Sequence, residues 1–174
     1  MSWKSLVIIS ITCALWTACE SSDEPAAPPE GFTQISCLDV EGACHHILAG
    51  DADGLQERTN LLVDGETLVL AEGTWNLDNQ VTIRGASGIR IVGQGMDLTT
   101  LSFADQAVQG NGVDVVGDDF TLENLTVADS TKDGVRIEDS VGVTLRGVRV
   151  TWTNGPATEN GAYGLYPVTS ENVL

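Results

Sequence analysis

Basic side chains are scarce in this chain. Only 8 Lys and Arg stand against 25 Asp and Glu in 174 residues, which gives a formal net charge of −17 at pH 7. A surface that binds nucleic acid needs clustered cations to neutralise phosphates, so we expect no nucleic-acid partner. The acidity also disfavours a polyanionic substrate unless a cation mediates its binding. Two interpretations of the acidity stay open, namely solubility outside the cell and the binding of cations.

Aromatic residues and long apolar runs are also few. Aromatics make up 5% of the chain while Gly reaches 19, so the core is expected to be aliphatic and the chain to turn often. The apolar stretch 6–18 spans only thirteen residues. That length is too short to cross a bilayer, but it suits the apolar region of a signal peptide.

The end of this stretch predicts export and lipidation. Residues 15–19 (LWTAC) resemble a bacterial lipobox, with Ala18 directly before Cys19. We therefore expect a signal peptide over 1–18, a lipid on Cys19, and a lipidated tether and Cys-containing linker over 19–50. The mature protein would be an exported bacterial lipoprotein at the outer membrane or cell surface, in contact with a membrane through its lipid.

The remaining cysteines form an even pair. Loss of the signal peptide removes Cys13, which leaves Cys37 and Cys44 beside the lipidated Cys19. In an exported protein such a pair predicts a local disulfide. A zinc site with His45 and His46 is the competing interpretation, but its spacing is too short for typical zinc ligands. We expect no metal there and solvated histidines.

A repeated eight-residue sequence motif, the strand phrase, is the basis of the fold prediction. Residues 120–127 (FTLENLTV) return 23 residues later as 143–150 (VTLRGVRV), each with two period-two strands around a one-residue corner. Glycine-led third strands begin at Gly112, Gly134 and Gly164, and the phrase starts again at Asn172. Such a repeat predicts a β-solenoid, with each repeat one coil. We expect further coils after residue 174.

The phrase also predicts which side chains face outward. Equivalent positions of stacked coils lie about 4.8 Å apart. Glu123 is therefore expected under Arg146, on the outer face and exposed, with Leu122 inside under Leu145. Replacing Glu123 by Ala is expected to cost under about 1 kcal/mol.

A helix is predicted before the first strands. Residues 51–62 offer an Asp cap, early acids and spaced leucines, and a solenoid must cover the open end of its first coil. The solenoid domain is therefore expected over 51–174, with this helix as its cap.

Residues 64–75 (DGETLVLAEGTW) and 91–101 (IVGQGMDLTTL) resemble the opening coils of right-handed parallel β-helices of the pectate-lyase-like superfamily. Residues 160–168 (NGAYGLYPV) are similar to a family of exported bacterial parallel β-helix repeat proteins. The resemblance implies an all-β, right-handed parallel β-helix. It does not fix an activity, because this fold hosts lyases, hydrolases, epimerases and non-enzymes.

An insertion marks the candidate site. Six residues, 128–133, connect the first phrase to Gly134, but thirteen, 151–163, connect the second to Gly164. Longer loops on a regular solenoid commonly carry function. Aromatic rings beside Asn, Thr and Glu suit the apolar faces and hydroxyls of sugars. The expected saccharide contacts are Trp152, Asn154, Glu159, Asn160, Tyr163 and Tyr166, and a packed loop is the alternative.

Charged residues nearby are candidates for chemistry: Asp129, Lys132, Asp133, Arg149 and Glu159. Two carboxylates could act as acid and base on a glycosidic bond, and Asp129 with Asp133 could hold a Ca²⁺ that neutralises a uronate. No other cofactor is expected. The motifs of enzymatic relatives are missing, and Asp118 and Asp119 are interpreted as turn residues.

The sequence thus predicts a surface-anchored module that binds or processes a polysaccharide or oligosaccharide, with a structural or protein-interaction solenoid as the alternative.

Overall fold

The computed structural model describes residues 34–174. The predicted signal peptide 1–18, the lipidation site Cys19 and the first part of the tether lie outside the described residues. The elements are η1 (Cys37–Asp39), β1 (Cys44–Ile47), α1 (Ala52–Thr59), β2 (Thr67–Leu70), β3 (Gly73–Asn76), β4 (Val81–Arg84), β5 (Arg90–Val92), β6 (Thr99–Ser102), β7 (Val113–Val116), β8 (Thr121–Ala128), β9 (Val135–Glu138), β10 (Thr144–Thr151) and β11 (Leu165–Val168).

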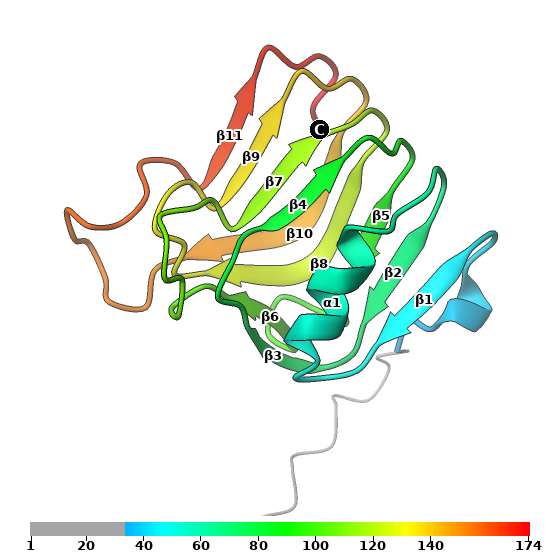
Figure 1. Ribbon diagram of the computed structural model, residues 1–174, viewed down its shortest axis with the longest axis horizontal. Helices are drawn as coiled ribbons and strands as arrows, with labels where there is room; N and C mark the ends of the chain where they lie inside the picture. The colour runs from blue at the N-terminus through cyan, green and yellow to red at the C-terminus, as the bar shows by residue number, and fades with distance from the viewer. Residues whose placement is uncertain (1–33) are drawn as a thin grey trace, which may run out of the picture. The chain divides into compact units, whose positions relative to one another are not determined.

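These strands stack in parallel as a β-solenoid of about five turns (Figure 1). One sheet runs β1-β2-β5-β8-β6-β3 with β10 on β8, and the other runs β11-β9-β7-β4. The longer strand β8 pairs with β5 through its first half and with β6 through its second half. The predicted parallel β-helix is therefore confirmed.

The predicted register is also confirmed. Thr121 pairs with Thr144 and Glu123 with Arg146, while Leu122 lies under Leu145 in the interior. The one-residue corner falls at Asn124, whose φ of 54° lies in the left-handed region that Asn tolerates better than most residues. The period-two apolar pattern specifies this register, because a shift of one residue would turn every apolar side chain outward.

The predicted exposure of Glu123 is wrong. Glu123 points outward but is only 3% exposed. Its carboxylate accepts hydrogen bonds from Nε of Arg90 and from Nε of Arg146, each at 2.7 Å. Because parallel stacking places an arginine on the coil before and the coil after, the two guanidinium groups cover the carboxylate.

The solenoid starts earlier than residue 51. Strand β1 precedes the helix and pairs with β2, with Cys44 opposite Thr67. Helix α1 then lies beside β4, the edge strand of the second sheet, and buries Leu55 completely in the core (Figure 1). Asp51 caps it by accepting a hydrogen bond from the Gly54 amide at 3.0 Å. The capping helix is thus present, and it covers the open end of the β4 sheet.

A buried carboxylate lies beneath this cap. Glu66 is fully buried and accepts a hydrogen bond from the Val63 amide at 3.0 Å. Its other oxygen pairs with Arg58 of the helix and with Nε2 of His45, the latter at 2.5 Å. His45 is therefore not simply solvated, because it contacts a buried carboxyl group that the sequence pattern did not reveal.

A disulfide joins η1 to the start of β1. Cys37 of η1 and Cys44 of β1 are bonded, with 5.5 Å between their Cα atoms. Among residues 34–174 no group of three or more His, Cys, Asp or Glu lies close enough to hold a metal ion. Within the same range, no helix has the length and apolar character needed to cross a membrane.

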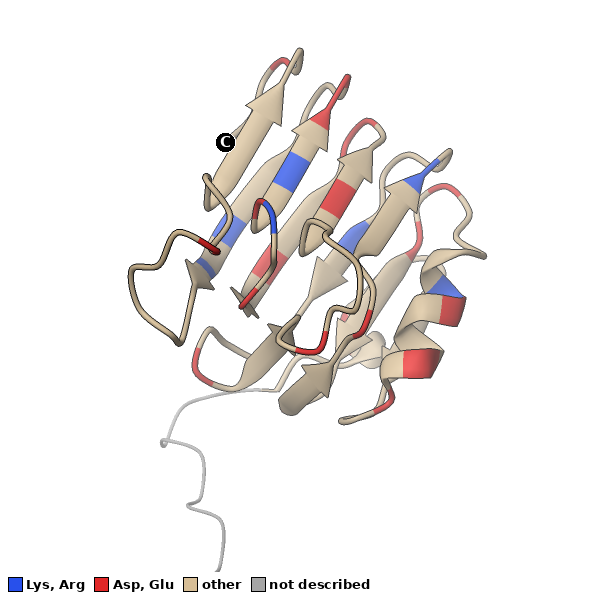
Figure 2. Cartoon of the chain, turned by 60° about the vertical axis from the view of Figure 1, so that its left-hand side comes forward, with Lys and Arg blue, Asp and Glu red and all other residues tan. Residues whose placement is uncertain are grey.

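Many acidic residues occupy the turns, whereas most Arg residues lie on strands (Figure 2). Asp118 Oδ1 accepts a hydrogen bond from the Val141 amide of the next coil at 2.9 Å, and Asp64 Oδ1 does the same for Ser87 at 2.8 Å. Asp119 has a φ of 54°, as expected for a turn. Part of the acidity therefore serves coil stacking at the corners.

Candidate functional site

The insertion forms a loop that projects from the solenoid between β10 and β11 (Figure 1). It begins with a tight turn in which the Gly155 amide donates to the Trp152 carbonyl at 3.1 Å. Gly155 has a φ of 72°, a conformation that glycine adopts without steric cost. The equivalent connection of the coil below, between β8 and β9, is shorter.

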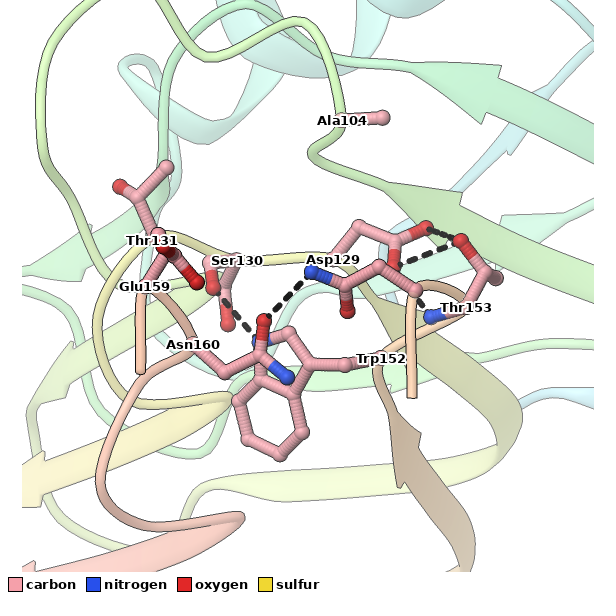
Figure 3. A pocket seen from close by; sticks show the side chains of 9 residues that line it. Ala104, Asp129, Ser130, Thr131, Trp152, Thr153, Glu159 and Asn160 are labelled. Carbon is pink, nitrogen blue, oxygen red and sulfur yellow. Dashed lines mark hydrogen bonds between the residues drawn. The ribbon is translucent and has the colours of Figure 1, made fainter. Parts of the chain in front are cut away.

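The loop and the corners below it enclose a hollow of about 260 Å³ (Figure 3). Four predicted contact residues line it, together with corner residues of the two preceding coils. The lining residues are Ala104, Asp129, Ser130, Thr131, Trp152, Thr153, Asn154, Glu159 and Asn160. Three successive coils thus contribute to one site.

Trp152 is the half-buried aromatic wall of the hollow. Its Nε1 donates a hydrogen bond to the Ser130 carbonyl at 2.7 Å (Figure 3). This bond joins the ring to the coil below and fixes its orientation. A ring held in this way is prepared for contact with a flat apolar ligand face.

Two amide side chains brace the loop across the hollow. Asn154 Nδ2 donates to Asn160 Oδ1 at 2.9 Å, and Asn160 Nδ2 donates to the Gly155 carbonyl at 2.7 Å. The two asparagines therefore hold the two ends of the loop together while lining the same hollow as Trp152.

The two carboxylates of the hollow differ in their surroundings. Asp129 accepts hydrogen bonds from the Thr153 amide at 2.6 Å and from the Thr153 hydroxyl at 3.0 Å (Figure 3). Glu159 is exposed on the loop. Asp129 thus stabilises the corner, whereas Glu159 stands at the rim.

The other charged candidates lie outside the hollow. Asp133 accepts from the Tyr163 amide at 3.3 Å, and Arg149 donates to Asp97 at 2.7 Å. Lys132 is exposed and does not line the hollow. Asp129 and Asp133 each accept a backbone hydrogen bond from the next coil, from the Thr153 and Tyr163 amides respectively.

The two tyrosines form a separate aromatic surface. Tyr163 and Tyr166 stack with their ring centroids 4.5 Å apart and their planes at 15°. Tyr166 is the register partner of Arg136 on β9, and Tyr163 is 51% exposed. A hydrogen bond to Glu138 raises the pKa of Arg136 above its ordinary value. Neither tyrosine lines the hollow.

Sequence reasoning missed four lining residues: Ala104, Ser130, Thr131 and Thr153. Ser102 pairs with Ala128, which places Ala104 directly below Ser130 at the same corner. The register of the phrase, continued one coil back, would have shown this.

We compared the chain with protein-family models, with curated proteins and with solved structures, and found no match in any of the three.

Proposed function

We propose that this chain is a saccharide-binding β-solenoid of the pectate-lyase-like kind, and that the hollow beside Trp152 is its binding site. One observation carries the proposal: an oriented Trp ring forms a wall of a hollow that also contains amide, hydroxyl and carboxylate groups. Apolar surface with a few converging polar groups is the usual composition of a ligand site. A ring face against sugar C–H groups, with polar groups toward hydroxyls, suits a saccharide.

The proposal is binding, without a chemical step. Lys132 and Arg149, the two basic residues among the catalytic candidates, lie outside the hollow. Asp129 is engaged with Thr153, which leaves Glu159 as the one carboxylate with a rim position. The proposal therefore concerns recognition by the groups that line the hollow.

We also propose that the chain is exported and anchored to a membrane by a lipid on Cys19. The apolar stretch 6–18 before Cys19 and the bonded pair Cys37–Cys44 support this, because disulfides persist in oxidising compartments. A fatty-acid probe should label the wild type and leave Cys19→Ala unlabelled in cells. Equal labelling of both proteins would contradict the anchor.

Tryptophan fluorescence tests the binding proposal directly. Trp75 is fully buried in the core and reports folding, whereas Trp152 lies in the hollow. Titration with a panel of neutral and charged oligosaccharides should perturb the wild-type emission, and Trp152→Ala should abolish the response while Trp75 emission stays native-like. Tyr163→Ala, outside the hollow, is the matched control and should retain binding.

Saccharide binding that survives in Trp152→Ala would contradict the site. A wild type that binds no member of the panel would contradict the function, and a structural or protein-interaction solenoid would then be the better description.

A further inference from the structure

The ligand class follows from the hydrogen bonds of the hollow. We propose that the hollow selects a saccharide bearing free amino groups over a uronate; the inference rests on the proposed saccharide-binding function. The resemblance to pectate-lyase-like proteins would instead suggest a polyuronate. The charges and donor groups of the lining favour the opposite choice.

Most hydrogen-bond donors of the lining side chains donate to protein acceptors, and each of the two asparagine amides keeps one N–H that does not. Trp152 Nε1 donates to the Ser130 carbonyl, and Thr153 donates to Asp129 through both its amide and its hydroxyl. The remaining donating side chains also have protein acceptors, namely Asn154, Asn160, Ser130 and Thr131. A ligand carboxylate, which only accepts when ionised, finds among these side chains the remaining N–H groups of the two asparagines and no cationic donor.

The charges of the lining have one sign. Its two ionisable side chains are the carboxylates of Asp129 and Glu159. Arg149 lies outside and is paired with Asp97. A uronate entering the hollow would meet like charge, whereas an ammonium group offers three donors and the opposite charge. The net charge of −17 acts in the same direction at long range.

Glu159 is the residue best placed to recognise the amine. It stands exposed on the loop, so it can follow a ligand, whereas Asp129 is held by Thr153. An exposed ion pair contributes modestly, so we expect its loss to weaken binding by up to about fivefold.

The test uses three oligosaccharides of equal length: oligomers of glucosamine, of N-acetylglucosamine and of galacturonate. Calorimetry at pH 6 and physiological salt, on the full chain, should rank the glucosamine oligomer tightest and the galacturonate oligomer weakest. Glu159→Gln should bring the glucosamine oligomer toward the affinity of its acetylated form. Glu171→Gln, an exposed acid of the last described turn, is the control for net charge and should change nothing.

The outcomes separate this inference from the proposed function. Equal affinity for the glucosamine oligomer and its acetylated form, or tightest binding of galacturonate, would overturn the selectivity while saccharide binding stands. Glucosamine-oligomer binding that Glu171→Gln weakens as much as Glu159→Gln would also overturn it, because general acidity would explain the affinity. If none of the oligomers binds, the proposed function fails as well.

Discussion

Two neighbouring coils use the same strand phrase in different surroundings. The β8 coil comprises β8 and β9, and the β10 coil comprises β10 and β11. Their strands share one register, yet Leu122 of the β8 coil is fully buried while Leu145 of the β10 coil is half-buried. The β8 coil is covered by coils on both sides, and the described part of the β10 coil is covered mainly on one.

Their corners differ more than their strands. The β8 coil turns through a short connection, whereas the β10 coil carries the loop with Trp152. In these two coils the phrase therefore sets the register, the neighbouring coils set the burial, and the connection carries the candidate site.

The largest expected effect tests burial. Leu122→Ala should lower the free energy of unfolding by about 2–5 kcal/mol, because it leaves a cavity between two coils. Leu145→Ala should cost about 1 kcal/mol, because its side chain is only partly removed from water. Urea denaturation of the two variants measures the difference, and equal losses would contradict the role of the neighbouring coils.

A second substitution tests the outward-facing interaction of Glu123 with Arg90 and Arg146. Glu123→Ala should cost about 1.5–3 kcal/mol, because it removes charged hydrogen bonds to Arg90 and Arg146 at a buried position. Arg146→Ala is the control and should cost under about 1 kcal/mol, since its side chain is 71% exposed. The same denaturation experiment applies. If Glu123→Ala lowers the free energy of unfolding by no more than Arg146→Ala does, the buried carboxylate does not stabilise the fold as proposed.

The smallest stability effect concerns the corner itself. Asp129→Asn should cost about 1 kcal/mol, because a neutral amide oxygen accepts the Thr153 hydrogen bonds less strongly than a carboxylate. Amide hydrogen exchange at Thr153 should accelerate, with the interior of β10 unchanged. Unaltered exchange at Thr153 would show that Asp129 does not hold the loop.

The strand register could be predicted because the phrase occurs twice in clear period-two form. The burial of Glu123 could not, because Arg90 lies on β5, a strand of three residues without the phrase. Strand β1 was missed for a related reason. Its sequence, CHHI, has no apolar alternation, and pairing with β2 is what makes it a strand.

The candidate site was likewise predicted only in part. The insertion pointed to Trp152, Asn154, Glu159 and Asn160, which do line the hollow. Tyr163 and Tyr166 were predicted on the same face, but Tyr166 lies on β11 beside Arg136 and stacks with Tyr163 instead. Sequence spacing located the loop, whereas the direction of each side chain depended on where β11 begins.

Exchange of the corners of the two coils tests whether the loop carries the binding site. Residues 151–163 are replaced by the six residues of the equivalent connection, 128–133. Trp75 emission and circular dichroism should stay native-like, because the strands and their register are unchanged, and saccharide binding by calorimetry should be lost. Trp152→Ala in the full chain provides the same comparison without altering the loop length. Undiminished saccharide binding by either folded variant would show that this corner is not the binding site.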